Sequence, residues 1–225
     1  VSRDGKLWTT KDALQEEHAL LSMAKKGVGQ LMPVSTPERA QDYLAKTHLS
    51  VEQKEAITTL CTNTNRVIPI QGLAGVGKTT MMKAFVDVCE QNNHEMILLA
   101  PTHNAAKELR ANGLSAQTLD AFLKSSALSN NVETMNDKSV VIDNASNKNY
   151  PIYILDEATM ASTKRQCQLV KIVEAQGGKF IPVGDVFQFS SIEAGKMHEN
   201  LQSIGIEVIK MTDIQRQRNN PELLS

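Results

Sequence analysis

A short segment of the chain combines three glycines, a lysine and a threonine at the spacing G-x-x-x-x-G-K-[ST]. Glycines let successive backbone N–H groups turn inward around an anion, and the lysine after them adds a positive charge. The segment therefore predicts binding of a nucleoside triphosphate, with Lys78 at the outer phosphates and Thr79 completing the shell of Mg²⁺. The predicted binding residues of this loop are Gly72, Gly75, Val76, Gly77, Lys78, Thr79 and Thr80.

The position of the segment favours this interpretation over a glycine-rich turn that arose by chance. It follows the apolar run Val67–Gln71, which predicts a strand, and it begins a predicted helix over Lys78–Gln91. The amino end of a helix carries partial positive charge, so this strand–loop–helix order places the loop where a phosphate is stabilised.

A second candidate for the same site is the acidic pair Asp156-Glu157, which directly follows the apolar run Ile152–Leu155. A carboxylate at the end of a neighbouring strand can hold the metal of a phosphate loop, so we expect Asp156 to bind Mg²⁺. Glu157 is expected to orient or deprotonate the attacking water. The alternative is an ordinary charged strand end.

Three further residues are candidates on weaker local evidence. Gln188 follows a predicted strand and the turn Gly184-Asp185, and its amide can sense a γ-phosphate. Gln53 precedes the phosphate loop, and its amide can bind adenine. Arg216 follows a predicted strand, and its guanidinium can stabilise charge on a transferred phosphoryl group. Each residue also has an ordinary alternative. Gln188 is equally typical of a turn, Gln53 of a helix surface, and Arg216 of a solvated arginine.

The pattern of the chain beyond residue 50 predicts an α/β fold with a central, mostly parallel sheet. Short apolar runs rich in Val and Ile alternate with helical segments, as in sheets that are covered on both faces. The predicted strands are Val67–Gln71, Met96–Ala100, Val140–Ile142, Ile152–Leu155, Phe180–Val183 and Val208–Met211. The predicted helices of this part are Lys78–Gln91, Asn104–Asn112, Thr118–Lys124 and Thr163–Gln176.

The first part of the chain has a different character. Apolar spacing predicts a helix over Trp8–Lys26 and a second helix over Pro37–Lys46, with a glycine- and proline-containing linker between them. We therefore expect a small helical N-terminal segment and linker over 1–47 and the α/β domain over 48–225. Because the chain begins at Val1 and ends abruptly at Ser225, we expect it to be a piece of a longer protein.

Composition limits the function only loosely. A hydrophobic fraction of 41% and a charged fraction of 22% are typical of a soluble globular protein. The 24 basic and 25 acidic residues nearly cancel, so net charge neither supports nor excludes a DNA partner. Three scattered cysteines argue against disulfides and a zinc site and fit the reducing cytoplasm. We expect no membrane span, because no apolar run is long enough.

The order of these motifs resembles helicases of superfamily one, in the RecD-like branch that includes Dda-type helicases and the motors of TraI- and TraA-type conjugative relaxases. The resemblance covers Leu49 to about Gln217. It is carried by segments similar to the adenine-reading motif, motif I, two DNA-contacting motifs and motifs II to IV. These are Leu49–Gln53, Gly72–Thr80, Ala100–Lys107, Thr118–Leu123, Asp156–Met160, Gly184–Gln188 and Met211–Gln217. Departures are small: Thr159 replaces a usual serine, and Phe189-Ser190 stands where Leu-Pro is common.

The resemblance implies a RecA-like P-loop domain that acts as the first motor domain of a 5′–3′ DNA helicase. Such enzymes hydrolyse ATP between two RecA-like domains, and the second domain is missing from this chain. We therefore expect ATP and Mg²⁺ binding, weak hydrolysis at best and no strand separation by this chain alone. The expected partners are single-stranded DNA, the second motor domain and the conjugative transfer machinery.

The same resemblance assigns DNA contact to Thr102, His103 and Thr118. Hydroxyl groups and strand-end N–H groups can hold phosphate without net positive charge, and Lys107 and Lys124 add electrostatic attraction. The alternative for the threonines is helix capping, and for the lysines it is simple solvation.

Several functions remain open at this point. The segment Leu7-Trp8-Thr9-Thr10, followed by Glu16 or Glu17, resembles the helix that precedes the motor in conjugative relaxases and favours that origin. The rivals are a RecD- or Dda-like repair or replication helicase and a module that binds single-stranded DNA or is recognised for secretion. Degenerate modules usually lose the loop lysine and acidic pair, which are present here. A nucleotide kinase or GTPase leaves the DNA-contacting motifs unexplained.

Overall fold

A six-stranded parallel β-sheet forms the centre of the structure, a computed structural model that describes residues 11–73, 75–133, 149–184 and 201–213. The strand order is β3-β2-β4-β5-β1-β6, and every described pair of neighbouring strands runs parallel. The predicted α/β fold with a parallel central sheet is confirmed. The strands are β1 (Ile70–Gly72), β2 (Met96–Ala100), β3 (Ala116–Thr118), β4 (Ile152–Leu155), β5 (Lys179–Gly184) and β6 (Ile209–Met211).

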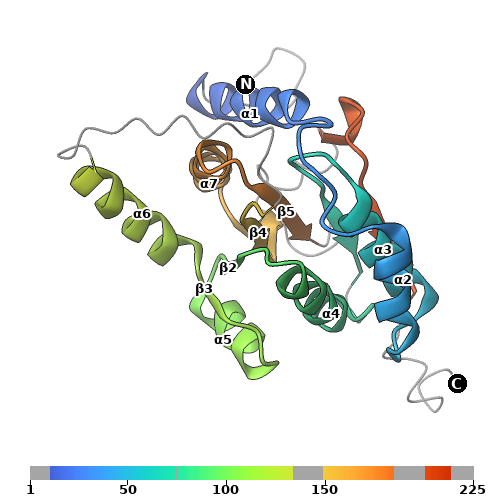
Figure 1. The fold of residues 1–225 in the computed structure, drawn as a ribbon. Helices are drawn as coiled ribbons and strands as arrows, with labels where there is room; N and C mark the ends of the chain where they lie inside the picture. Colours follow the sequence, from blue (N-terminus) through green and yellow to red (C-terminus); the bar gives the residue numbers. More distant parts are fainter. Residues whose placement is uncertain (1–10, 74, 134–148, 185–200, 214–225) are drawn as a thin grey trace, which may run out of the picture.

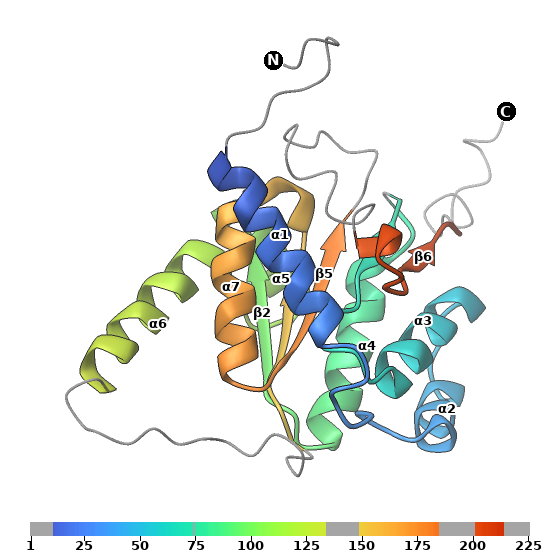
Figure 2. The ribbon, with the colours of Figure 1, turned by 90° about the horizontal axis from the view of Figure 1, so that it is seen from above.

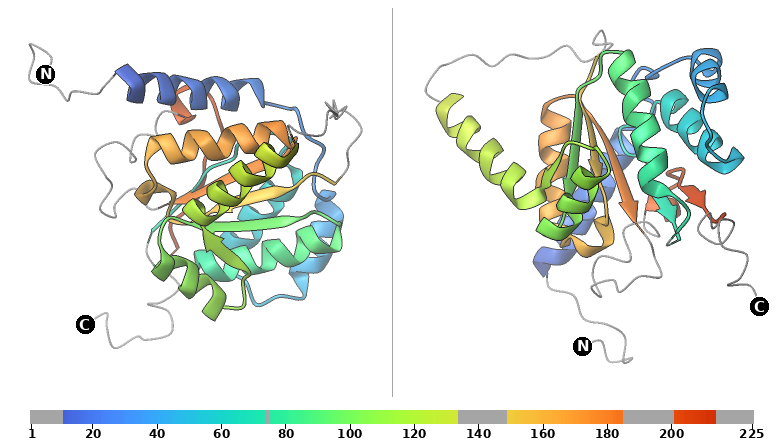
Figure 3. Two further views of the ribbon diagram at one scale, coloured as in Figure 1. Left: turned by 90° about the vertical axis from the view of Figure 1, so that its left-hand side faces the viewer. Right: turned by 90° about the horizontal axis from the view of Figure 1, so that it is seen from below.

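Helices cover both faces of the sheet (Figures 1 and 3). One layer contains α1 and α7, and the other contains α3, α4 and α5, with α2 packed on α3. The helices are α1 (Lys11–Lys26), α2 (Pro37–Ala45), α3 (Val51–Thr62), α4 (Lys78–Gln91), α5 (His103–Ala111), α6 (Leu119–Glu133) and α7 (Thr163–Ala175), with a 3₁₀ turn η1 (Ala158–Met160). None of the helices in the described part of the chain has the length and apolar character needed to span a bilayer.

Alternating side chains of the strands supply two separate hydrophobic cores. In β4, Ile152 and Ile154 pack with α4 and α5, whereas Tyr153 and Leu155 pack with α1 and α7. Successive side chains of a strand point to opposite faces, so a strand buried on both sides is apolar throughout. This explains why the continuous apolar run at 152–155 predicted a strand correctly.

The structure differs from the sequence predictions at three places. The first strand begins at Ile70 and not at Val67, which makes only an isolated bridge to Phe180. Helix α3 was not predicted, although Ser50 and Gln53 form a capping box at its start. Strand β3 was also not predicted, because three residues are too few to establish an alternating pattern. The predicted strand Val140–Ile142 and the first residues of the helix predicted over Trp8–Lys26 lie outside the described residues.

Helix α1 lies along α7, far from it in sequence, as Figure 2 shows. Leu20 and Ala24 are buried in this contact, and the Cys167 thiol donates a hydrogen bond to the Glu16 carbonyl at 2.8 Å. On the opposite face, α2 packs on α3 through Ala40 and Leu44. Described residues of the N-terminal segment therefore contribute to both cores, while the division of the chain at residue 48 stays a prediction.

A fully buried lysine lies at the amino end of β5. Lys179 is 0% exposed, and its ammonium donates to the carbonyl oxygens of Leu60 at 3.3 Å and Asn63 at 2.5 Å. The ammonium thus satisfies carbonyl groups at the carboxyl end of α3, which have no partner within the helix. Burial lowers the pKa of Lys179 to about 8, because it disfavours the charged form.

The buried lysine predicts a pH-dependent stability for the whole domain. Between about pH 8 and pH 10.5 the folded chain has released this proton while the unfolded chain still holds it. Stability contributed at Lys179 therefore rises with pH across this window, by on the order of 3 kcal/mol. Urea unfolding at several pH values measures this, with Lys179→Met as the reference in which the group is absent. Parallel pH profiles of the two proteins would contradict the prediction.

Candidate nucleotide-binding site

The candidate residues that the structure describes meet at one edge of the sheet, where the parallel strands end. The phosphate loop follows β1, the acidic pair follows β4, and α5 begins after β2. Between them lies a cavity of about 350 Å³. It is lined by Gly75, Gly77, Thr79, Thr80, Ala105, Glu108, Leu109, Asn112, Asp156 and Glu157. Ligands of open α/β sheets bind outside the carboxyl ends of the strands, so this cavity is the candidate site.

The phosphate loop has the backbone conformation that its glycines permit. Gly75 and Gly77 have φ values of 83° and 78°, in the left-handed region that other residues rarely adopt. A Cβ atom at Gly72 would lie 3.0 Å from the Lys78 side chain, so the close approach of lysine and loop requires glycine there. The Lys78 ammonium donates to the carbonyl oxygens of Gly72 at 2.6 Å and Leu73 at 3.3 Å. Its charge is thereby held at the mouth of the loop.

The acidic pair sits in an environment that disfavours its negative charge. Burial raises the pKa of the Asp156 carboxyl, opposed by the hydrogen bond from the Glu157 N–H and by the charge of Lys78. Burial also raises the pKa of Glu157, and the charges of Asp156 and Glu108 raise it further. A cation bound between these groups would relieve the repulsion, so their electrostatics favour a metal.

Glu157 has a strained backbone conformation, and a buried glutamine binds the turn that follows it. Its φ of 49° and ψ of 39° place a non-glycine residue in the left-handed region. The turn that follows is fixed by Gln166 of α7, whose Nε2 donates to the carbonyl oxygens of Ala158 and Ala161, both at 2.9 Å. Gln166 is 1% exposed, and its two contacts attach the turn after Glu157 to α7.

These residues fit a nucleotide with Mg²⁺. A Cβ atom at Gly72 would crowd the Lys78 side chain, and Gly75, Gly77, Thr79 and Asp156 line the same cavity. Within the described ranges no group of three or more His, Cys, Asp or Glu side chains could hold a metal by itself. Mg²⁺ usually takes one or two protein ligands and completes its shell with phosphate and water, a role open to Thr79 and Asp156.

Gln53 makes a different contact from the one predicted for an adenine reader. It is 4% exposed, and its Nε2 donates to the carbonyl oxygens of Val76 at 3.3 Å and Gly77 at 3.2 Å. Its Oε1 accepts from the Ser50 N–H at 2.9 Å. Both ends of the amide therefore bind backbone, and Gln53 ties the start of α3 to the phosphate loop. A role in recognising adenine stays a prediction.

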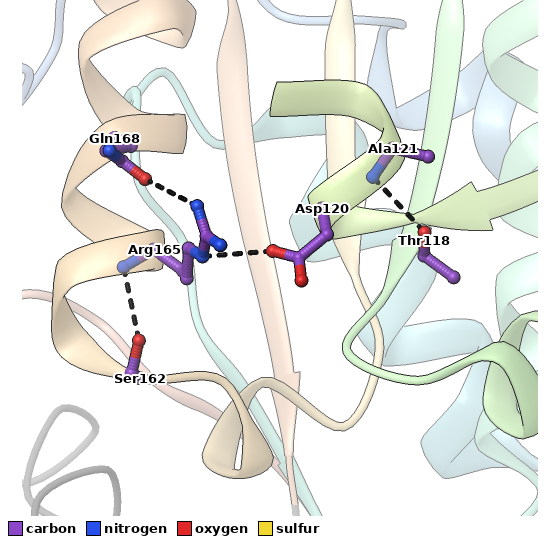
Figure 4. Close-up of polar contacts among 6 residues, drawn as sticks. All are labelled: Thr118, Asp120, Ala121, Ser162, Arg165 and Gln168. Carbon is purple, nitrogen blue, oxygen red and sulfur yellow. Dashed lines mark hydrogen bonds and ion pairs between the residues drawn. The ribbon is translucent and has the colours of Figure 1, made fainter. Parts of the chain in front are cut away.

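The predicted DNA-contacting residues lie together at the same edge of the sheet. Thr102 follows β2, and Thr118 ends β3 directly opposite Ala100 of β2. Both hydroxyls cap helices. Thr102 accepts from the Ala105 N–H at 3.2 Å, and Thr118 accepts from the Ala121 N–H at 3.2 Å, as Figure 4 shows. The structure therefore shows helix capping, the alternative to DNA contact, at both threonines.

The other residues predicted to attract or contact DNA are exposed to solvent. His103, Lys107 and Lys124 are all exposed. His103 is the first residue of α5 and adjoins Thr102, so it is accessible at the edge where the two strands end. Exposure leaves all three side chains accessible, and DNA contact by them stays a prediction.

An ion pair joins the helices that flank this edge. Arg165 Nε lies 2.9 Å from Asp120 Oδ1, and the Arg165 guanidinium also donates to Gln168 at 3.3 Å (Figure 4). Both charged side chains are about half exposed, so the pair is screened by solvent. It connects the first turn of α6 to the first turn of α7, which Ser162 caps.

Some site residues lie outside the described residues, and others escaped prediction. Gln188 and Arg216 belong to the first group, and their roles stay predictions. Glu108 and Gln166 belong to the second group, since nothing in their local sequence distinguishes them from surface residues of a helix. Their importance follows from tertiary proximity: the charge of Glu108 acts on Glu157, and Gln166 binds the turn after the acidic pair.

The parallel sheet, the loop between β1 and α4 and the acidic pair after β4 define a RecA-like P-loop domain. The AAA domain family matches residues 48–224, and the chain belongs to that family.

Similar proteins include conjugation proteins and helicases. Multifunctional conjugation protein TraI of Escherichia coli (strain K12) is 28% identical over 222 residues, which are 96% of this chain and 12% of TraI. Conjugal transfer protein TraA of Agrobacterium fabrum is 31% identical over 163 residues, 72% of this chain and 14% of TraA. The ATP-dependent RecD2 DNA helicase of Deinococcus radiodurans is 28% identical over 177 residues, 77% of this chain and 22% of RecD2.

The fold is also similar to that of a solved helicase. The crystal structure of Pif1 helicase from Candida albicans matches with a TM-score of 0.54 and 15% identity, over 79% of this chain and 43% of that one. Together with the family match and the relatives, this confirms the resemblance to superfamily-one helicase motors of the TraI and RecD type. The chain spans only 12% of the TraI sequences that it matches.

The contacts of Gln53 predict that it affects nucleotide affinity in a way that its capping partner does not. Ser50→Ala and Gln53→Ala each break the capping box, so each should lower the free energy of unfolding by about 1 kcal/mol. Only Gln53→Ala also releases the carbonyl groups of Val76 and Gly77, and it should weaken nucleotide binding several-fold. Titration with a fluorescent ATP analogue, alongside urea unfolding, separates the two effects. Equal affinities in the two variants would show that Gln53 only caps the helix.

Proposed function

We propose that this chain is the ATP-binding first motor domain of a 5′–3′ DNA helicase that unwinds plasmid DNA as part of a conjugative-transfer relaxase. The observation that carries the proposal is the cavity in which the phosphate loop and the acidic pair face each other. A P-loop with such a pair is the arrangement that nucleoside triphosphate hydrolysis uses. The similarity to TraI and TraA favours conjugation over repair.

In this proposal the residues at the cavity have distinct roles. Lys78 leaves the loop carbonyls for the β- and γ-phosphates, which are stronger, charged acceptors. Thr79 and Asp156 hold Mg²⁺, which neutralises charge on the phosphates when it is bound. Glu157 accepts a hydrogen bond from the attacking water and orients it. Its strained position, fixed through Gln166, keeps the carboxylate at the cavity wall.

The remaining roles follow the motif order. Gln188 senses the γ-phosphate, and Arg216 stabilises the charge that develops on it. Residues 48–225 form the motor domain, which we infer to work with a second RecA-like domain. By itself this chain binds ATP with Mg²⁺ and hydrolyses it weakly. Single-stranded DNA passes over the edge formed by Thr102, His103 and Thr118.

Removing the loop lysine should abolish tight nucleotide binding. Lys78→Ala deletes a charged hydrogen-bond donor to phosphate, so we expect the dissociation constant for Mg²⁺-ATP to rise about 10- to 100-fold. Lys83→Ala is the matched control, because Lys83 lies on the same helix, is exposed and does not line the cavity. Isothermal titration calorimetry, with and without Mg²⁺, measures the change. Failure of the unaltered chain to bind nucleotide would overturn the proposed function.

The exposed histidine at the start of α5 should contribute to DNA affinity. His103→Ala removes one hydrogen-bond donor without removing a helix cap, so we expect single-stranded DNA binding to weaken about 3- to 10-fold. His18→Ala removes an exposed histidine from α1 and serves as the control. Fluorescence anisotropy with labelled oligothymidine measures both variants. Affinity should also fall as salt rises if phosphates are contacted. Equal effects of the two substitutions would argue against a DNA path at this edge.

A further inference from the structure

Two helices start side by side at the edge to which the proposed function assigns single-stranded DNA. Helix α6 begins directly after Thr118, the last residue of β3, and α7 begins after the turn that follows the acidic pair. Strand β2 pairs with both β3 and β4 in parallel register, so both helices start at the same edge of the sheet.

The predicted DNA-contacting threonine at this edge is largely covered. Thr118 is 7% exposed, and its hydroxyl caps α6 by accepting from the Ala121 N–H at 3.2 Å. A DNA strand at this edge therefore meets other side chains of the two helix starts. Those exposed in the first two turns of α6 and α7 include three cations and one anion. They are Lys124, Lys164, Arg165 and Asp120.

The anion and one cation form an ion pair that solvent reaches. Arg165 Nε donates to Asp120 Oδ1 at 2.9 Å, and the guanidinium also donates to Gln168 Oε1 at 3.3 Å (Figure 4). The side chains of Arg165 and Asp120 are 43% and 56% exposed, and an ion pair this exposed contributes little to stability. A guanidinium has five N–H donors, of which these contacts with described residues use two. Arg165 can therefore exchange one anion for another.

The positive charge of α7 lies where helix stability does not favour it. Lys164 and Arg165 belong to the first turn of α7, and the helix dipole disfavours cations there. That turn has no acidic residue, so Asp120 of α6 supplies the compensating negative charge. The chain as a whole has a net charge of −1, so any attraction to DNA depends on local groups such as these.

We propose that Arg165 is a phosphate-binding residue for single-stranded DNA, and that Asp120 holds it at the edge and competes with DNA for it. A DNA phosphate replaces the Asp120 carboxylate at the guanidinium, which binds both anions with the same pair of parallel N–H donors. Lys124 and Lys164 add electrostatic attraction on either side. This inference rests on the proposed function, because it takes single-stranded DNA as the partner from there.

The first test removes the guanidinium. Binding of labelled oligothymidine to the full chain is measured by fluorescence anisotropy. Arg165→Ala should raise the dissociation constant about 3- to 10-fold, because one charged contact to phosphate is lost. Lys171→Ala is the matched control, since Lys171 is an exposed cation further along the same helix. It should change the constant less than about twofold.

The second test removes the competing carboxylate and predicts a change of opposite sign. Asp120→Asn should tighten DNA binding about 3- to 10-fold. In combination with Arg165→Ala the gain should disappear, so the double variant should bind within about twofold of Arg165→Ala alone. Glu90→Gln is the control, because it removes an exposed carboxylate from the last turn of α4, which runs away from this edge. It should leave DNA affinity unchanged.

The salt dependence separates a phosphate contact from a structural role. Each phosphate contact to a single strand contributes about 0.7 to the slope of log affinity against log salt concentration. Arg165→Ala should reduce the slope by about that amount. Arg165→Lys keeps the charge and should retain the slope and most of the affinity. A lysine variant as weak as the alanine variant would contradict a contact based on charge.

Each other outcome rejects a defined part of the inference. A gain from Asp120→Asn that persists without Arg165 would show that the carboxylate simply repels DNA. Weaker DNA binding by both single variants, with equal weakening of ATPγS binding, would show that the ion pair only fixes α6 against α7. If His103→Ala weakens DNA binding and Arg165→Ala does not, this inference is wrong and the proposed function stands. If the unaltered chain does not bind single-stranded DNA, the proposed DNA contact fails as well.

Discussion

Parallel pairing of the strands is the constraint on which the rest of the described structure depends. Because β1, β2, β3 and β4 run in the same direction, the segments that follow them emerge at one edge. The phosphate loop, the acidic pair and the capped starts of α5 and α6 are brought together in this way, although they come from distant parts of the sequence. Parallel strands require long crossovers, and the helices that make them bury both faces of the sheet.

The close approach of Lys78 to the phosphate loop requires contacts from other parts of the structure. The left-handed glycines place Lys78 against the Gly72 carbonyl, but their conformational freedom gives the loop little rigidity of its own. Gln53 supplies backbone contacts from α3 on one side. On the other side Gln166 fixes the turn after Glu157 from α7. Helices from both layers therefore determine the shape of one cavity.

Sequence reasoning was most successful where local chemistry and strand ends coincide. The loop at Gly72 and the pair at Asp156 each follow an apolar strand, and a parallel sheet leaves little choice about where such segments meet. Helix α3 was missed because β-branched Ile57, Thr58 and Thr59 weaken its helical pattern. The contacts of Gln53 with the phosphate loop and of Gln166 with the turn after Glu157 depend on tertiary proximity, which no local pattern encodes.

The packing of α1 on α7 has a practical consequence for work with this domain. A recombinant fragment that starts where the family match begins, at residue 48, would lack α1. Leu20 and Ala24 share a buried hydrophobic cluster with side chains of α7, so removal of α1 would expose apolar side chains of that cluster to water. Exposed apolar surface promotes self-association and poor solubility. Fragments intended for biochemistry or crystallisation should therefore retain α1.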